Sequence, residues 1–168
     1  MNSPFANLFL AIQQHVKDGM PTVKYIDQDL GQLKATSRPP VSWPCVLIDF
    51  EDFAYQNLGN NVQTATGTVV LRLGFAPFSG TSQVTPTPYV QQAISYYDIE
   101  WALHKLIQGW TPCANMGHMI RTSTITQKRT DNYRVRELRY SIAFEDYSTK
   151  PLQQLAPATL VVEELIVV

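Results

Sequence analysis

The segment "RPPVSWPCVLIDFEDFAY", residues 38–55, places a proline-rich stretch directly before an apolar run. The run CVLI, residues 45–48, does not alternate between apolar and polar residues, which is typical of a strand covered on both faces. The prolines remove backbone donors and fix how the chain approaches the strand. We therefore predict a central strand over residues 45–50, with Trp43 as an anchor at the sheet margin.

Three acidic residues follow this run: Asp49, Glu51 and Asp52. They form either a carboxylate cluster for acid–base chemistry or cation binding, or a polar strand exit that faces water. A catalytic pair needs a cleft and further partners. We favour the polar strand exit, and no catalytic residue is assigned here.

The segment before residue 38 contains a predicted helix and a long connection. Ser3 can cap a helix over residues 3–19, Pro4 suits its first position, and its apolar residues fall on one face. Residues 21–40 contain few core-like residues, so we expect an extended arm that rests on a surface or on another subunit.

After residue 52 the sequence predicts two further strands, a loop and a second helix. The strands are expected over residues 53–58 and 66–75, with a turn at residues 59–61 between them. Residues 77–88 are rich in Ser, Thr, Gly and Pro, which predicts a flexible surface loop. Residues 89–108 carry an apolar stripe at helical spacing.

A hairpin is predicted over residues 118–146, with a two-residue turn at Asp131 and Asn132. That register places Ile125 opposite Leu138, and Met119 opposite Phe144. The order of helix, strands, helix and strands predicts an α+β fold, with an antiparallel or mixed sheet packed by two main helices. Residues 1–150 are expected to form a single domain, and residues 151–168 a C-terminal tail that serves as an added strand or arm.

Composition argues against several classes of partner. The 168 residues carry a net charge of −1, which gives no electrostatic case for specific binding to nucleic acid or to anionic lipid. No apolar run approaches the roughly 20 residues that span a bilayer. Only 16% of residues are charged, which suggests that much of the surface contacts protein. Cys45 and Cys113 are expected to be free, buried thiols in a reducing cytoplasm, and a Cys45–Cys113 bridge is the alternative.

The common catalytic and cofactor motifs do not occur in the sequence. His104, Cys113 and His118 lack the spacing of a zinc site, so no metal is expected. Tyr96, Tyr97 and Trp101 form either a base-stacking platform or part of a core or interface, and helical spacing favours the latter. We expect a protein without catalytic residues or cofactors.

Basic residues concentrate in the predicted hairpin, where six of the 13 in the chain fall between residues 121 and 139. The predicted register places Arg129 opposite Arg134, and like charges paired across strands destabilise a hairpin. Either the hairpin is solvated with its charges apart, or its tip contacts an acidic partner. That partner is nucleic acid or the acidic residues of a neighbouring copy, in a head-to-tail contact that closes a ring. The residues of this hypothetical interface are Lys128, Arg129, Arg134, Arg136, Asp49, Glu51 and Asp52.

Several segments together resemble a known family. They are "LFLAIQQHV", "YIDQDLGQL", "RPPVSWPCVLIDF", "TGTVVLRLGF" and "YYDIEWALHKLIQGW", in this order. The pattern, over about residues 5–147, resembles the tail terminator (tail completion) proteins of long-tailed bacteriophages, and residues 39–50 are its most specific part.

The resemblance implies an α+β fold and a hexameric ring at the head-proximal end of the tail tube. It implies contacts with the tail-tube protein and with neck proteins, and no enzyme activity. The alternatives are another phage neck or tail-tube ring protein, or a small cytoplasmic ligand-binding protein or enzyme with a cleft at helix 89–108.

Overall fold

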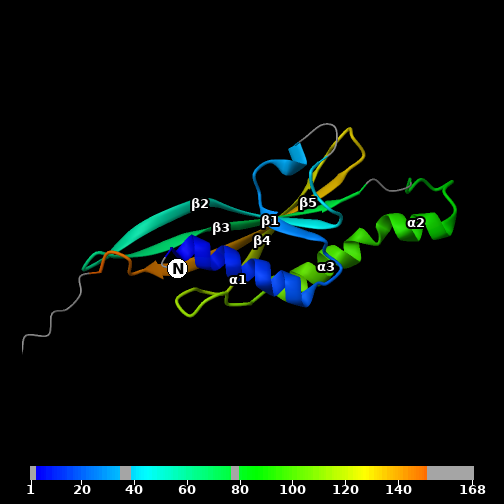
Figure 1. The fold of residues 1–168 in the computed structure, drawn as a ribbon. Helices are drawn as coiled ribbons and strands as arrows, with labels where there is room; N and C mark the ends of the chain where they lie inside the picture. The colour runs from blue at the N-terminus through cyan, green and yellow to red at the C-terminus, as the bar shows by residue number, and fades with distance from the viewer. Residues whose placement is uncertain (1–2, 35–38, 77–79, 151–168) are drawn as a thin grey trace, which may run out of the picture.

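The computed structural model describes residues 3–34, 39–76 and 80–150 (Figure 1). The predicted C-terminal tail, residues 151–168, and residues 77–79 of the predicted loop lie outside the described residues. The elements are α1 (Pro4–Gly19), β1 (Tyr25–Gln28), the 3-10 helix η1 (Gln32–Lys34), β2 (Cys45–Gly59), β3 (Val62–Phe75), α2 (Thr87–Ile94), α3 (Tyr96–Ile107), β4 (Ile120–Gln127) and β5 (Arg134–Asp146).

The strands form one five-stranded mixed sheet in the order β1-β2-β3-β5-β4. Strand β1 pairs with β2 in parallel, and the other neighbours are antiparallel. The predicted α+β fold is therefore confirmed. The prediction for residues 21–40 was incomplete, because that connection contains β1 and η1. None of the described helices is both long enough and apolar enough to cross a bilayer.

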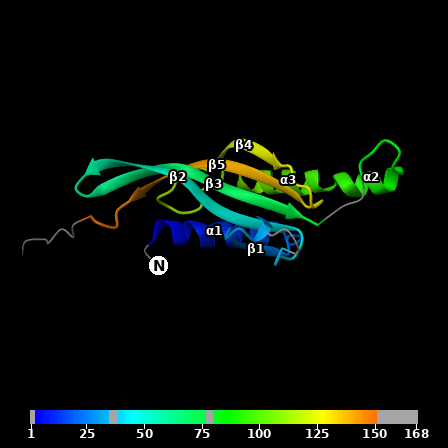
Figure 2. The same ribbon diagram turned by 90° about the horizontal axis from the view of Figure 1, so that it is seen from above.

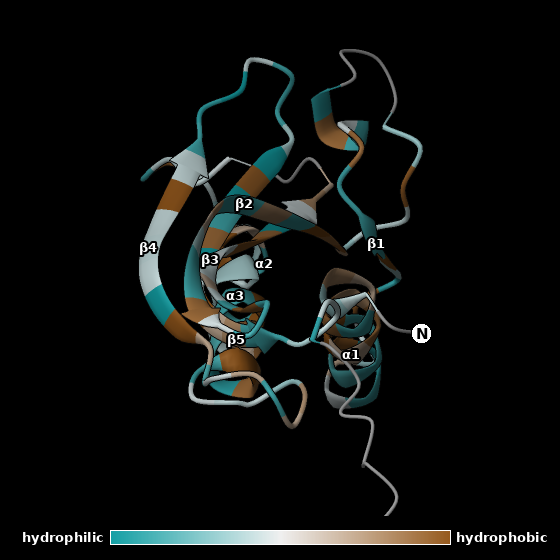
Figure 3. Cartoon of the chain, turned by 90° about the vertical axis from the view of Figure 1, so that its left-hand side faces the viewer, coloured by the Kyte–Doolittle hydropathy of each residue, from teal (hydrophilic) through white to brown (hydrophobic). Residues whose placement is uncertain are grey.

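Helices α1 and α3 cover one face of the sheet, which we call the helix face (Figure 2, Figure 3). Alternate residues of each central strand point to this face, as the period of a strand requires. Its core is fully or almost fully buried and includes Leu8, Ile12, Val16, Ile48, Val69, Leu71, Leu73, Leu103, Ile107, Leu138, Tyr140 and Ile142. The predicted packing of two main helices on the sheet is thus confirmed.

The second predicted helix is two helices, α2 and α3, separated at Ser95. Helix α2 begins at Thr87, so the last two positions of the predicted loop, residues 87 and 88, are helical. In Figure 1, α2 projects beyond the sheet at one end of the molecule, and the β2–β3 turn lies at the other end.

Strand β2 is a single strand, whereas the sequence predicted two strands separated by an acidic exit. A β-bulge lies between Glu51 and Ala54, and Asp52 in the bulge has φ 56°. The extra residue shifts the alternation of the strand. As a result Phe50 and Phe53 both pack against the helix-face core, where their rings contact the ring of Phe5.

The turn predicted at residues 59–61 is confirmed, since Gly59 pairs with Val62 around Asn60 and Asn61. Both asparagines have positive φ, 51° and 58°. A two-residue loop of this kind matches the twist of the strands that it joins.

The predicted register of the β4–β5 hairpin was wrong. Ile125 lies opposite Glu137, and Thr124 lies opposite Leu138. Strand β4 ends at Gln127, so the connection is a six-residue loop rather than a two-residue turn. Phe144 is bridged by Met116 instead of Met119.

A smaller apolar cluster covers one end of the opposite face of the sheet. Leu33 from η1 and the partly buried Trp43 pack with Cys45, Leu47 and Val135. The ring of Trp43 stacks on Tyr133 at 5.1 Å between centroids. The prediction that Trp43 anchors the sheet margin is therefore confirmed. Beyond this cluster the same face carries charged residues, and we call it the ionic face.

Candidate interaction surfaces

Arg72 lies at the centre of the ionic face, on β3. Its guanidinium contacts four carboxylates, which come from Asp29, Asp49, Glu51 and Glu137. The three separations to Asp49, Glu51 and Glu137 are 3.1, 2.9 and 3.2 Å. Burial disfavours the charged guanidinium, but the hydrogen bonds to Asp29 and Asp49 outweigh this effect and raise the pKa of Arg72.

Arg139 on β5 extends the same network. It contacts Glu51 at 2.9 Å and Glu137 at 2.6 Å. Burial acts to raise the pKa of Glu137, but the hydrogen bond from Arg139 and the positive charges of Arg72 and Arg139 outweigh it, so that this pKa is lowered. We define this network as Arg72, Arg139 and their four carboxylates, each of which is paired with at least one of the two arginines.

The structure contradicts part of the predicted acidic interface of Asp49, Glu51 and Asp52. Asp49 and Glu51 do not mark a strand exit, because β2 continues past them and both pair with Arg72 in the same chain. Asp52 is exposed in the bulge. Of the three acids, Asp52 alone is exposed and outside the Arg72 network in the described structure.

Arg129 and Arg134 do not lie opposite each other across the hairpin, contrary to the predicted register. Arg129 lies in the loop after β4, where it pairs with Asp131 and donates to the carbonyl oxygen of Leu33. Arg134 lies opposite Phe75 of β3, and its guanidinium sits 4.3 Å from the ring centre of Tyr96. The strain that motivated an acidic partner at this tip is absent.

Arg136 is also used within the chain, since it makes two hydrogen bonds to Glu100 of α3, at 2.6 and 2.9 Å. Glu100 is largely buried, and a bidentate arginine is the partner that such a carboxylate requires. Lys128 remains exposed. Sequence reasoning missed Arg72, Asp29, Glu100 and Glu137. The signal for Arg72, Glu100 and Glu137 was a charged residue inside a predicted strand or helix, whereas Asp29 lies in the predicted arm.

Exposed apolar side chains gather on the outer side of α2 and α3. Ile94, Tyr97 and Trp101 are 43%, 52% and 62% exposed, and their spacing of three and four residues places them on one side. Lys105 lies 4.4 Å from the ring centre of Trp101. We call these three apolar residues the helical stripe. Tyr96, in contrast, is buried in the core, so the three aromatic residues singled out in the sequence do not form one platform.

A second group of exposed apolar side chains lies on the distal part of the β2–β3 hairpin. Tyr55 and Leu58 are 48% and 56% exposed. The β2–β3 turn and helix α2 lie at opposite ends of the elongated molecule (Figure 1, Figure 2). Large exposed apolar residues that share one side of a helix, as in the helical stripe, are typical of surfaces that contact another protein.

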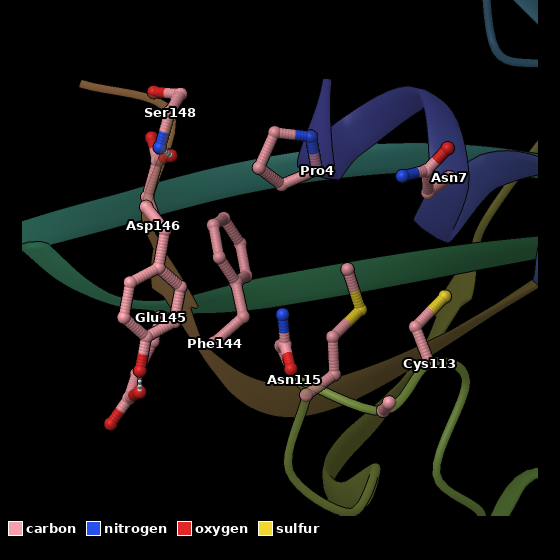
Figure 4. Close-up of a pocket in the computed structure, with 11 residues that line it drawn as sticks. Pro4, Asn7, Cys113, Asn115, Phe144, Glu145, Asp146 and Ser148 are labelled. Atoms are coloured by element: carbon pink, nitrogen blue, oxygen red, sulfur yellow. Dashed lines mark hydrogen bonds between the residues drawn. The ribbon is translucent and has the colours of Figure 1, made fainter. Parts of the chain in front are cut away.

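A pocket of about 350 Å³ lies between the start of α1, residues 113–116 and the end of β5 (Figure 4). Its eleven lining residues include Cys113, Glu145 and Asp146 but no histidine or lysine. Burial raises the pKa of the Cys113 thiol, which keeps it protonated at neutral pH. The lining therefore holds no histidine or lysine that would lower the pKa of this thiol. It also lies apart from helix 89–108.

The histidines all have structural contacts. His15 stacks on Trp110 at 4.0 Å, and His118 hydrogen-bonds Thr111 at 2.8 Å. His104 contacts the hydroxyl of Tyr140 at 3.4 Å, and burial followed by the charge of Arg121 lowers its pKa. Among the described residues no group of His, Cys, Asp and Glu side chains could hold a metal ion.

Both cysteines are free in the described structure, with Cys45 buried and Cys113 partly buried. This confirms the expectation of unpaired thiols. The chain matches no known protein-family model, and no curated protein matches it significantly.

Proposed function

We propose that the protein is a structural virion component, a tail terminator that forms a ring, expected to be a hexamer, on the head-proximal end of a phage tail tube. Its partners would be further copies of itself, the tail-tube protein and the neck or connector proteins. DNA would pass through the ring without specific binding. Assembly would take place in the bacterial host cytoplasm, and no catalytic activity is part of the proposal.

The observation that carries the proposal is the presence of two different exposed apolar surfaces at opposite ends of one chain. The helical stripe starts at the last residue of α2, the helix at one end of the molecule, and Tyr55 and Leu58 lie on β2 close to the β2–β3 turn at the other end. A contact between unlike surfaces is head-to-tail, and repeated copies close into a ring when the rotation allows it. The sequence resemblance supplies the place of such a ring in the virion.

The test is the solution mass of the purified protein, alone and with a tail-tube protein, combined with negative-stain images. We expect a closed ring with a central pore. An open-ended polymer would favour the alternative of a tail-tube protein. A monomer that stays monomeric at high concentration and in the presence of tail tubes would contradict the proposal.

A matched pair of variants tests the surface itself. The double variant Tyr97→Ala with Trp101→Ala should reduce the ring fraction, because it removes the largest exposed aromatic area at one end. The control is Leu10→Ala, which removes an apolar side chain that is 46% exposed on α1. Equal assembly of both variants would place the contact elsewhere.

A further inference from the structure

Strand β4 forms one edge of the sheet, next to β5. It is eight residues long, and no described strand pairs with its outer side. Ile120 and Ile125 are each 44% exposed. An edge strand with exposed apolar side chains is a template for an added strand unless something covers it.

The sequence beyond the last described residue has the composition of such a strand. Residues 160–168 read LVVEELIVV, which is rich in β-branched residues. Residues 151–168 contain Glu163 and Glu164 but no Lys or Arg, whereas residues 118–130 contain Arg121, Lys128 and Arg129 but no Asp or Glu. The two segments are therefore of opposite charge, and residues 160–168 are about as long as the eight-residue strand β4.

Residues 160–168 can approach β4 only from the point where the described chain ends. Thr149 donates a hydrogen bond of 2.8 Å to the carbonyl oxygen of Asn61, so the chain leaves beside the β2–β3 turn. Gln127 lies opposite Val135, which lies opposite Gly74. The Gln127 end of β4 is therefore level with Gly74 across the sheet. Along β3, the distance from Asn61 to Gly74 is about 43 Å at ~3.3 Å per residue.

Residues 151–160 can span only about 33–36 Å when fully extended. Leu160 therefore cannot reach the Gln127 end of β4 in its own chain. It can reach the nearer end at Ile120, and pairing within one chain would then run parallel to β4. A segment that starts at the Gln127 end must come from another copy.

In a head-to-tail ring the hairpin end of one copy would face the α2 end of the next. The β4–β5 loop lies at that same end, where Gly80 and Thr81 share a pocket with Thr126 and Asn132. The segment leaving one copy would thus meet the next copy at Gln127 and run toward Ile120.

We propose that residues 160–168 of one copy add as an antiparallel strand to the outer edge of β4 in the neighbouring copy. The added strand supplies backbone hydrogen bonds to the edge, and Ile120 and Ile125 lose exposed area beneath its side chains. In this direction Glu163 lies opposite Thr124, and Glu164 lies opposite Ser123, two positions from Arg121. This inference rests on the proposed ring.

The test is disulfide trapping in a Cys113→Ser background. Thr126→Cys or Thr122→Cys is combined with Val161→Cys or Leu165→Cys, each pair in one chain. Antiparallel pairing between copies predicts covalent dimers and larger products from Thr126 with Val161 and from Thr122 with Leu165. Thr126 paired with Leu165, and Thr122 paired with Val161, should give much less covalent product. Lys17→Cys on α1 is the control for random collision.

Two outcomes overturn the inference. Disulfides within single chains, strongest for Thr122 with Val161, would show that the segment covers its own edge in the parallel direction. No trapping above the Lys17 control, with rings intact, would refute the strand addition and leave the proposed function standing. A monomeric parent protein would instead count against the ring itself.

A second measurement avoids engineered thiols. Replacing Val162 by Pro removes a backbone donor from the segment, and Val162→Ala keeps that donor. We expect amides of β4 to lose hydrogen-exchange protection in the proline variant and to keep it in the alanine variant. Unchanged protection in both would contradict the pairing.

Discussion

The helix face and the ionic face of the sheet bury their side chains by different means. The helix face packs apolar residues from α1, α3 and the strands around Leu71 and Leu138. The ionic face holds Arg72, whose side chain is 16% exposed, among carboxylates of which Asp29 and Glu137 are 7% exposed. One face is stabilised by apolar area removed from water, and the other by the pairing of charges that would be costly to bury alone.

The comparison shows why loss of one group has different consequences on each face. Removing an apolar side chain costs its own burial and leaves a cavity. Removing Arg72 costs little area, but it leaves several carboxylates without their counter-charge. Substitutions on the two faces therefore separate the two mechanisms.

The largest effect is expected from Leu103→Ala on the helix face. Leu103 is fully buried, so the free energy of unfolding should fall by about 2–5 kcal/mol, measured by urea denaturation. Leu10→Ala on α1 is the control, since its side chain is 46% exposed and its change should stay within about 0.5 kcal/mol. Equal losses would show that α3 is not packed as described.

Arg72→Met should be nearly as damaging on the ionic face, with a loss of about 3 kcal/mol at pH 7. The methionine keeps much of the side-chain volume, so the loss reports unpaired carboxylates rather than a cavity. The loss should shrink at acid pH as those carboxylates become protonated. A loss that does not change with pH would mean that packing, not charge, stabilises this face.

Gly67→Ala should cost about 1–3 kcal/mol, because a β-carbon there would lie 2.4 Å from the ring of Phe53. Adding Phe53→Leu should recover part of the loss. Gly74→Ala tests the ionic side of the same strand, where the nearest atoms are the Cys45 sulfur at 2.7 Å and the Trp43 ring at 2.9 Å.

Gly80→Ala is the control for both glycines, since its nearest contact is an ordinary 3.6 Å. Its thermal midpoint should match that of the parent. A Gly67→Ala variant as stable as Gly80→Ala would show that the Phe53 ring does not occupy the space over Gly67.

The smallest effect concerns the pH dependence of stability. The pKa of Glu137 is lowered from its ordinary value of 4.5, so the folded state binds its proton less readily than the unfolded state. Its contribution is complete above about pH 4.5 and is lost as the pH falls through the lower folded pKa. Glu137→Gln should flatten this part of the curve of unfolding free energy against pH, and an unchanged slope would contradict the pairing.

The helix face could be predicted from the sequence because it depends on periodicity. The spacing of Leu8, Ile12 and Val16 and the alternation of Leu138, Tyr140 and Ile142 identify buried sides without knowledge of the partner strand. The ionic face could not, because Arg72 lies 43 residues from Asp29 and 65 from Glu137 in the sequence. Only the pairing of β3 with its neighbours brings these groups together.

Two local features account for the remaining errors. The left-handed backbone of Asp52 allows a bulge, so a continuous strand was predicted as two. Asp131 accepts hydrogen bonds from Arg129 and from the backbone of Tyr133, which stabilises a longer loop than the Asp-Asn pair suggested. Side-chain hydrogen bonds of this kind compete with the tight turn that the sequence favours.

The Arg72 network also has a consequence for how the sheet assembles. A slip of β3 by one residue would turn Arg72 into the apolar layer beneath the helices and bring Leu71 and Leu73 to the other side. The guanidinium would then lose its carboxylates and be buried without a counter-charge. Misaligned strand pairings are therefore penalised by charge as well as by packing, and a single arginine discriminates against them during folding.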